Sequence, residues 1–423
     1  MNGRGMKMLA GLAFAASMLP AVAQGGEAAD AVVTHLYAGT ASEEIASAQI
    51  VCDEFNQDAC FGLGLLKLVS AYEGFAQDLY RYGATVPGNT AAAMLFGMGS
   101  TDDATPANPN PEQLTYPALR TVLDDFVTDI DAARVVFEQA GKDGDYVVTI
   151  DPTKVRLDLN GNGAVDEGEN LGVILIDVLF LAPGGSKTKS KGGPDYSIGF
   201  DRADSIWFAG YLQAVAAPFD LVLAHDFTAF YDAYLHRVFP NSGLPMGKFT
   251  EGGSLFMDAE SDAGIADLVA GIHTLNFPVE DSARLAGVLD RLKAITALSR
   301  KNWEAILAET DDNRELVPSP AQTSLVPGHD VTEEVVGAWM ATLDTVDKVL
   351  AGELLVPHWR FKQGFDLPAY FQTALNTDLV LLITGSGATP YLSDDHPIAD
   401  ARSFSEANRV FGNDWLNYVF WFN

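Results

Sequence analysis

The spacing of the apolar residues restricts the fold of this chain more than any other feature of its sequence. Between positions 60 and 83 these residues recur every three or four places, so they would share one face of an α-helix. They are Phe61, Leu65, Leu68, Val69, Tyr72, Phe75, Ala76 and Leu79. A helix with such a face buries it against its neighbours. The same period returns in residues 111–141, 279–309 and 331–351, and the fold is therefore predicted to be mainly α.

Two other stretches refine this prediction. Residues 202–239 are expected to form two helices that meet at Pro218, because proline interrupts helical hydrogen bonding. Residues 145–159, DYVVTIDPTKVRLDL, are rich in β-branched side chains and broken by Pro152, which predicts two short strands. The predicted fold class is a helical globular domain with a few short β-strands.

The first 23 residues have the three parts of a signal peptide. The basic start MNGRGMK precedes the apolar MLAGLAFAASMLP, and the small residues Ala21 and Ala23 predict cleavage after Ala23. No later stretch supplies the about 20 apolar residues that a membrane-spanning helix needs. The longest, residues 171–182, is too short and contains Asp177. The mature chain is expected to be exported, to the periplasm or the extracellular space, with no membrane-spanning segment.

The chain is strongly acidic, with 57 Asp and Glu residues against 26 Lys and Arg residues and a net charge of −31. A surface of this sign repels phosphate backbones and anionic lipids, which argues against nucleic acid and membrane surfaces as partners. It also concentrates cations around the protein. The 48% of hydrophobic residues is ordinary for a packed globular protein.

Cys52 and Cys60 are the two cysteines of the chain. An exported protein meets an oxidising compartment, where such a pair is expected to form a disulfide. On one straight helix the two would lie about 12 Å apart, too far for a bridge. Residues 56–58, Asn-Gln-Asp, provide a break that would bring them together. The alternative is a pair of free, buried thiols.

Residues 184–194, rich in glycine and lysine, form the best candidate for an internal link. They would separate an N-terminal helical region, residues 24–183, from a C-terminal helical region, residues 195–423. A surface loop inside one continuous domain is the alternative.

One short stretch spells out a specific chemistry. Residues 157–169 read LDLNGNGAVDEGE, and a twelve-residue register that begins at Asp158 places Gly163 sixth and Glu169 last. Oxygen-bearing residues occupy alternate positions, which lets a curling chain point them at one cation. Glycine at the sixth position allows a turn that a Cβ atom would hinder. The expected ligands are Asp158, Asn160, Asn162, Ala164 through its carbonyl, Asp166 through a water, and Glu169.

This register resembles the EF-hand calcium loop over these twelve residues. The preceding segment is β-branched and broken by Pro152 instead of helical, which makes the stretch more similar to dockerin-type and other bacterial EF-hand-like loops. The resemblance implies one bound Ca²⁺ with a structural role. A calcium sensor acts by changing the angle between the two helices that flank its loop, and no helix is expected before this loop. Two amides among the ligands predict a modest dissociation constant, of about 10⁻⁵–10⁻³ M. An Asx-rich surface turn is the alternative.

A second, incomplete match to the register begins at Asp258. Glu260 and Asp262 fill its third and fifth positions, but Ala263 and Val269 stand where glycine and the closing acid are needed. This segment is interpreted as the N-terminus of a helix with its capping acids.

His225, Asp232 and His236 are the best candidates for a transition-metal site. Their separations of 7 and 4 residues would place them within about 40° of each other on one helix. Imidazole and carboxylate groups suit zinc or copper. The simpler interpretation is a solvated polar face opposite an apolar stripe, and no fourth ligand can be named.

Glu73 lies at the edge of the apolar arc of its predicted helix. A half-buried acid of this kind can take part in proton chemistry. More often it is paired with an arginine, which is the expectation for Glu73.

The sequence assigns no catalytic residue. Ser386 in TGSGA does not match the nucleophile elbow, and zinc-protease, phosphate-loop and dinucleotide motifs are absent. The first hypothesis is an exported protein with one structural Ca²⁺ that binds an unknown protein or small ligand without catalysis. The second is a metal-dependent hydrolase that uses His225, Asp232 and His236.

Overall fold

The computed structural model describes residues 26–54, 56–85, 108–166, 169–171, 196–249, 254–325, 330–412 and 415–422. The expected signal peptide and the expected link at 184–194 lie outside these residues. Helices dominate the described chain, and its strands are two or three residues long. The predicted mainly α fold is confirmed.

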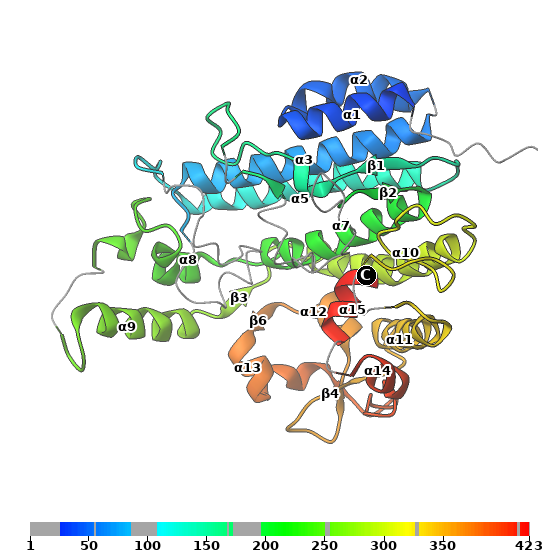
Figure 1. Ribbon diagram of the computed structural model, residues 1–423. Helices are drawn as coiled ribbons and strands as arrows, with labels where there is room; N and C mark the ends of the chain where they lie inside the picture. The colour runs from blue at the N-terminus through cyan, green and yellow to red at the C-terminus, as the bar shows by residue number, and fades with distance from the viewer. Residues whose placement is uncertain are drawn as a thin grey trace, which may run out of the picture.

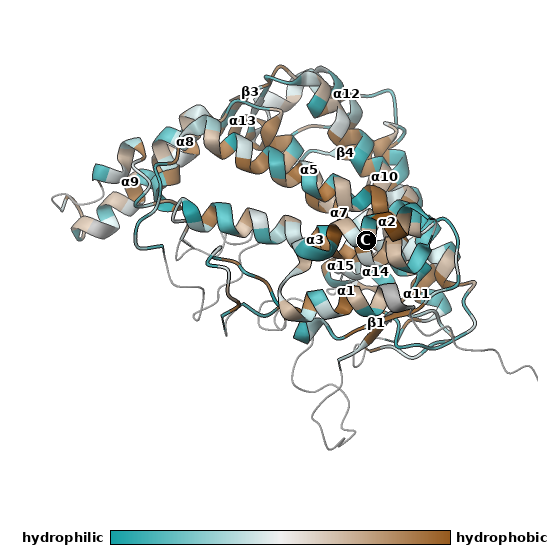
Figure 2. Cartoon of the chain, turned by 90° about the horizontal axis from the view of Figure 1, so that it is seen from above, coloured by the Kyte–Doolittle hydropathy of each residue, from teal (hydrophilic) through white to brown (hydrophobic). Residues whose placement is uncertain are grey.

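The first half of the structure is a stack of long helices (Figure 1). They are α1 (Glu27–Ala38), α2 (Ala41–Asp53), α3 (Gln57–Arg81), α5 (Tyr116–Ala140) and α7 (Arg202–Leu223). In Figure 1, α1 and α2 form the outer layer above α3 and α5, and α7 follows on the other side. Hydrophilic and hydrophobic residues alternate along α5 in Figure 2, as expected for a helix with one polar and one apolar face.

The second half begins against this stack, because α10 packs along α7. Its helices are α8 (Thr228–Tyr234), α9 (Ala259–His273), α10 (Ser282–Ile306), α11 (Glu333–Leu350), α12 (Leu367–Thr373), α13 (Leu379–Thr384), α14 (Ser405–Val410) and α15 (Trp415–Phe422). The described residues also contain 3₁₀ turns, η1 (Pro152–Lys154) in the first half and η2 (Leu235–Arg237), η3 (Pro245–Phe249) and η4 (Ser386–Tyr391) in the second half.

The strands form three small antiparallel sheets. β1 (Val148–Ile150) pairs with β2 (Ile198–Phe200), and β3 (Asn276–Pro278) pairs with β6 (Asn376–Asp378). β5 (Gly364–Phe365) lies between β4 (Val356–Pro357) and β7 (Leu392–Ser393). Each sheet joins segments that are distant in the sequence or closes a turn, and none forms a layer of the core.

The close approach of α3 to α5 explains one sequence feature of α3. A Cβ atom at Gly64 would lie 2.8 Å from the ring of Phe137, so the glycine lets the aromatic ring pack directly on the helix backbone. Phe61, on the same face, contacts the rings of Phe137 and Phe200. Phe61, Leu65 and Leu68 of the predicted face are buried. Leu63 and Leu66 outside it are buried too, because α3 packs against α1 and α2 as well as α5.

The largest hydrophobic cluster contains residues from both sides of the expected link. Ile130 of α5 and Leu212 of α7, both fully buried, belong to it. A second cluster surrounds Trp303, Trp339 and Phe422. A third lies between α10 and α12.

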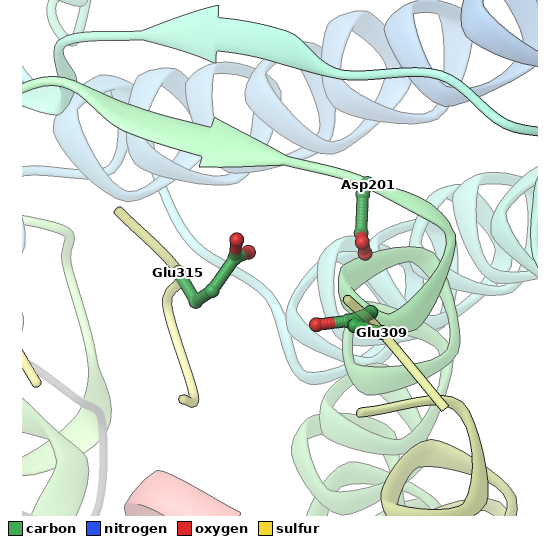
Figure 3. A group of neighbouring side chains, drawn as sticks. All are labelled: Asp201, Glu309 and Glu315. Carbon is green, nitrogen blue, oxygen red and sulfur yellow. The ribbon is translucent and has the colours of Figure 1, made fainter. Parts of the chain in front are cut away.

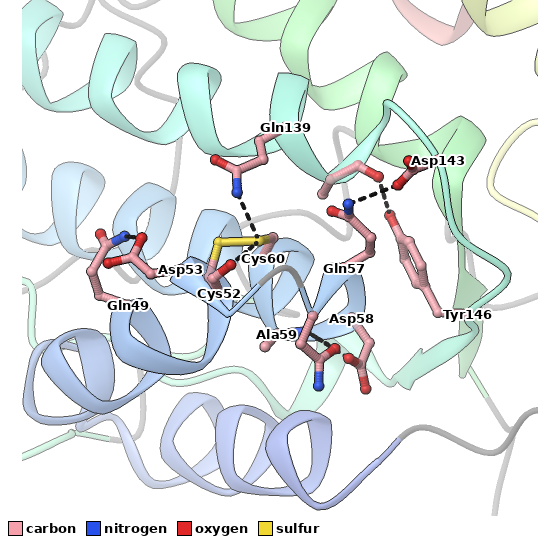
Figure 4. The surroundings of a disulfide bond; sticks show 12 residues. Gln49, Cys52, Asp53, Gln57, Asp58, Ala59, Cys60, Gln139, Asp143 and Tyr146 are labelled. Carbon is pink, nitrogen blue, oxygen red and sulfur yellow. Dashed lines mark hydrogen bonds between the residues drawn. A yellow bond between two sulfur atoms is a disulfide. The ribbon is translucent and has the colours of Figure 1, made fainter.

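The predicted disulfide is present (Figure 4). Cys52 lies at the end of α2 and Cys60 in the first turn of α3, with an S–S distance of 2.03 Å. The break between the helices is stabilised by Asn56, whose side chain accepts a hydrogen bond from the N–H of Ala59. Gln139 of α5 donates to the Cys60 sulfur, which places the bridge against the next layer of helices.

Two details of the sequence prediction are wrong. Pro218 lies inside α7, which continues to Leu223, and the chain leaves the helix only before α8. The second predicted strand is replaced by η1 and a single bridge between Arg156 and Asn170. Pro152 is the first residue of η1, where a backbone N–H would have no partner in the turn. Because η1 occupies residues 152–154, too few residues remain for a second strand.

By length and composition alone, α3 and α7 are apolar enough to cross a membrane. Of their most apolar windows, 61% and 56% of the residues are buried inside the protein. Such burial is typical of the core helices of a globular protein.

Candidate functional site

The loop from Asp158 to Glu169 is attached to the core helix α3 at its first residue. Glu73 accepts a hydrogen bond from the N–H of Asp158 at 3.0 Å, and Gln77 donates to its carbonyl oxygen at 2.7 Å. Glu73 and Gln77 are one helical turn apart, so together they can bind both the N–H and the carbonyl group of Asp158. Next to the loop, the N–H of Arg156 donates to the carbonyl of Leu36 in α1. The loop therefore starts from a fixed point on the helical stack.

Among the described residues no arginine forms a salt bridge with Glu73, which differs from the expectation for this residue. Burial raises the pKa of Glu73, and the negative charges of Asp158 and Glu169 raise it further, while the N–H of Asp158 acts in the opposite direction. Its partner is the loop itself.

The carboxylate of Asp158 organises the first half of the loop. Its Oδ1 accepts the N–H groups of Gly161 at 2.8 Å and Asn162 at 3.2 Å, and its Oδ2 accepts the N–H of Gly163 at 2.9 Å. Both glycines have positive φ, 70° at Gly161 and 77° at Gly163, a conformation that other residues adopt at a cost. The sharp turn expected at the sixth position is present.

The two amides repeat this arrangement further along the loop. Oδ1 of Asn160 accepts the N–H of Asn162 at 2.9 Å, and Oδ1 of Asn162 accepts the N–H of Ala164 at 2.7 Å. An amide oxygen has two acceptor positions, so each retains one for a further partner. Asn160 and Asn162 also donate through Nδ2 to Oδ2 of Asp166, at 3.3 Å each.

Glu169 closes the loop from below. Its side chain is 1% exposed, Oε1 accepts the N–H groups of Leu159 at 3.0 Å and Asn160 at 3.2 Å, and Oε2 accepts the N–H of Asp166 at 2.8 Å. Its backbone carbonyl accepts the N–H of Leu157, which joins the two ends of the loop.

The charge of the loop is not balanced by basic side chains. In the described parts of the chain, no Lys, Arg or His makes a salt bridge with Asp158, Asp166 or Glu169. A buried carboxylate of this kind is expected to have a positive partner. Of the five expected side-chain ligands, Asn160 and Asn162 contact Asp166, whereas Asp158 and Glu169 contact the backbone of the loop. The sixth expected ligand is the backbone carbonyl of Ala164.

The three residues of the alternative metal site, His225, Asp232 and His236, lie in different surroundings. His225 is buried, its Nδ1 lies 2.6 Å from the carbonyl oxygen of Leu221, and its Nε2 lies 2.6 Å from the hydroxyl of Thr377. Both ring nitrogens are therefore engaged by protein groups. Burial lowers the pKa of His225, which favours the neutral ring that such a hydrogen-bond chain requires.

His236 has a different partner. Its Nε2 lies 3.0 Å from a carboxylate oxygen of Asp267 in α9, which also pairs with Arg237. Asp232 is exposed on α8. His225 precedes α8 and His236 follows it in η2, so the three residues do not share one helix. The expected common face does not form, because the chain turns between α7 and α8.

The segment that begins at Asp258 is a helix N-terminus, as interpreted from its sequence. The side chain of Asp258 accepts the N–H of Ser261 and caps α9. Asp262 accepts the N–H groups of Phe256 and Met257.

One group of acids was not predicted from the sequence. Asp201, Glu309 and Glu315 have carboxylate oxygens within 4.8 Å of one another, and Figure 3 shows them converging from separate segments. Asp201 and Asp204 form the recognisable part, a capping box at the start of α7. Glu309 and Glu315 lie in irregular chain after α10, where no spacing rule predicts a neighbour more than 100 residues away.

Comparisons with protein-family models, with curated proteins and with solved structures each return no match for this chain.

Proposed function

We propose that this chain is an exported calcium-binding protein that holds one Ca²⁺ in the loop from Asp158 to Glu169. The ion has a structural role and stabilises a helical protein that binds another protein or a small ligand. The observation that supports the proposal is the buried carboxylate of Glu169 at the closing position of the loop, which accepts three backbone N–H groups of the loop and makes no salt bridge within the described residues.

The chemistry of the donors fits Ca²⁺. The loop offers carboxylate and amide oxygens and no nitrogen or sulfur ligand, which is the set that a hard cation of this size prefers. The intraloop hydrogen bonds fix the backbone around the expected ligands. The carboxylates of Asp158, Asp166 and Glu169 do not converge within 4.8 Å in the described chain, so binding requires these side chains to move toward the ion. Asn160 and Asn162 would exchange their weak contacts with Asp166 for contacts with the ion.

An ion can reach the loop from solvent. A cavity of about 330 Å³ lies beside it and is lined by Arg156, Val165, Asp166 and Asn170. Asp166 is exposed, which agrees with an acid that acts through a water molecule. The disulfide between Cys52 and Cys60 agrees with an oxidising compartment, and calcium is abundant outside the cytoplasm.

The effect on stability follows from mass action. At a calcium concentration 100 times the dissociation constant, the ion adds about 2.7 kcal/mol to the free energy of unfolding. The same hydrogen bonds also describe an Asx-rich turn that needs no ion, and an experiment separates the two.

The test is calcium titration of the purified, chelator-treated protein by calorimetry, with the bound metal identified by mass spectrometry. The protein should take up one equivalent of Ca²⁺ with a dissociation constant of about 10⁻⁵–10⁻³ M. Asp158→Asn should weaken binding at least tenfold. Asp258→Asn is the matched control, because it changes the first acid of the incomplete register at α9 and should leave binding unchanged.

Absence of calcium uptake at millimolar calcium would exclude the calcium site and favour the Asx-rich turn without an ion. Equal affinity of Asp158→Asn and the unchanged protein would place the bound calcium elsewhere. A stoichiometric transition metal in the purified protein would instead favour a metal enzyme.

A further inference from the structure

Four carboxyl groups meet where the two halves of the structure join. Asp201 follows β2 and caps α7, and Asp204 lies in the first turn of that helix. Glu309 and Glu315 belong to the 309–322 segment, which follows α10. We refer to these four residues as the carboxyl cluster.

The members of the carboxyl cluster are too close together to be ionised at the same time without a counter-charge. The oxygens of Asp201, Glu309 and Glu315 lie within 4.8 Å of one another, and Asp204 and Glu315 are 5% and 4% exposed. In the part of the chain that the structure describes, none of the four makes a salt bridge. Like charges at this distance and at this depth hold protons.

Asp201, Asp204 and Glu315 also hold backbone groups, whereas Glu309 accepts a hydrogen bond from the side-chain amide of Gln322 at 3.0 Å. Oδ1 of Asp201 accepts the N–H groups of Ala203 at 2.6 Å and Asp204 at 3.3 Å, while Oδ2 of Asp204 accepts the N–H of Asp201 at 2.9 Å. Oε1 of Glu315 accepts the N–H of Asn313 at 2.8 Å. The cluster therefore fixes the start of α7 and the turn of the opposing segment.

The 309–322 segment is held closely against β2 and α15. The N–H of Gly199 donates to the carbonyl of Arg314, and a Cβ atom at Gly199 would collide with the carbonyl oxygen of Asn313. Trp421 of α15 donates to the carbonyl of Leu316. Release of this segment would break the contact that it makes between the first helical stack and the C-terminal helices.

The charged and titratable groups around the carboxyl cluster are mostly acidic or neutral. From the 309–322 segment they are Asp311, Asp312 and Arg314, from α7 Arg202, and from the chain before β1 Tyr146. Arg314 donates to the carbonyl of Ser197, and the hydroxyl of Tyr146 pairs with that of Ser205.

Burial is the main reason that these acids keep their protons. Burial, and then the charge of Asp201, raises the pKa of Glu309 to about 9. Burial raises the pKa of Glu315 to about 7. Burial, followed by the charge of Asp201, raises the pKa of Asp204 well above its usual value.

We propose that the carboxyl cluster is a proton-dependent latch, which holds the 309–322 segment against β2 and the start of α7 in acid and releases it as the surroundings become alkaline. A proton on one carboxyl lets it donate to its neighbour, so protonated acids attract one another. Loss of the protons leaves adjacent negative charges that push the segment away.

The direction of the pH dependence follows from the raised pKa values. A carboxyl with a pKa above its unfolded value of 4.5 contributes full stability below pH 4.5 and loses it as the pH rises to the folded value. The window is therefore about pH 4.5–7 for Glu315 and about pH 4.5–9 for Glu309. Opening releases a proton from each group, and each proton changes the opening constant by about tenfold per pH unit.

The test is amide hydrogen exchange of the whole protein in chelator between pH 5 and 9, expressed as protection factors that remove the intrinsic pH effect. The reporter amides are those of Gly199, Asn313 and Ala203, and the amide of Leu66 in α3 serves as a reference. In the unchanged protein the reporters should lose protection by at least about tenfold per pH unit between pH 5 and 7. The reference should not follow them.

Glu309→Gln with Glu315→Gln should abolish most of this loss, because glutamine resembles the protonated acid in shape and cannot ionise. Glu315→Gln alone should remove the part of the protection loss that occurs below pH 7. Glu304→Gln, on the exposed side of α10, is the control and should keep the original profile.

An unchanged pH profile in the double variant would overturn the latch. A parallel loss of protection at Leu66 would also overturn it, since the response would then be global. If Mg²⁺ or Ca²⁺ restored protection of the reporters at pH 8 in the unchanged protein but not in the double variant, the cluster would be a cation site and the latch would again be wrong.

Discussion

Glu169→Gln gives the sharpest test of how the calcium loop is built. The change removes one carboxylate oxygen and puts an NH₂ group in its place, in a position that is 1% exposed. The two oxygens of Glu169 accept three backbone N–H groups, from Leu159, Asn160 and Asp166. An NH₂ group cannot accept any of them, so at least one buried donor loses its partner.

The structure therefore predicts a cost without calcium as well as with it. A buried donor without a partner costs about 1–3 kcal/mol, and this loss should appear in chelator. Calcium at 100 times its dissociation constant adds a further difference of up to about 2.7 kcal/mol, because the variant lacks one of the two closing oxygens. The difference in the free energy of unfolding between variant and unchanged protein should be about 1–3 kcal/mol in chelator, and calcium should enlarge it to at most about 4–6 kcal/mol.

Denaturant unfolding in chelator and in calcium gives the free energy of unfolding of both the variant and the unchanged protein, which makes four values to compare. Asp166→Asn is the matched control, because Asp166 is exposed and its side chain accepts only amide N–H groups from Asn160 and Asn162. It should have little effect in chelator and a smaller effect with calcium. Equal stability of Glu169→Gln and the unchanged protein in chelator would refute the role of Glu169 in the ion-free loop. A difference that calcium does not enlarge would refute its role as the closing ligand.

Three further changes test the surroundings. Gln77→Ala removes a hydrogen bond worth about 1 kcal/mol from the start of the loop, and calorimetry should show calcium binding weakened about fivefold. Cys52→Ala with Cys60→Ala opens a link between residues 8 positions apart. The cost of about 2.5 kcal/mol should lower the exchange protection of α2 amides about 70-fold. Gly199→Ala forces a methyl group onto an opposing carbonyl and should lower the free energy of unfolding, measured with denaturant, by about 1–3 kcal/mol. Gly287→Ala, with open space around it, should not.

The apolar spacing was a good guide to the helices because it records the side that each helix buries. α5, α10 and α11 begin and end close to the predicted limits for this reason. The spacing failed at Pro218, where the local rule favours a break. Pro218 and the residue one turn before it, Ala214, are both exposed, so the unpaired carbonyl faces water. The buried side of α7 packs against α5 and α10, and this packing outweighs the lost hydrogen bond.

The two acidic sites differ in how far the sequence could reveal them. The proposed calcium loop is local, so twelve consecutive residues contain the whole set of expected ligands and their spacing predicts the turn. The carboxyl cluster is assembled by tertiary contacts between α7 and the 309–322 segment. Nothing in the residues around Glu309 or Glu315 distinguishes them from solvated acids. The same limit applies to His225, whose partner Thr377 lies 152 residues away.

The anchoring of the calcium loop to α3 has a consequence for how the protein assembles. The contacts of Glu73 and Gln77 with Asp158 join residues that are 85 and 81 positions apart. A cation bound as proposed would therefore favour chains in which these remote stretches have already met, and its binding would depend on the completed N-terminal fold. A peptide that contains all twelve loop residues but begins after α3 should hold the ion more weakly than the whole chain.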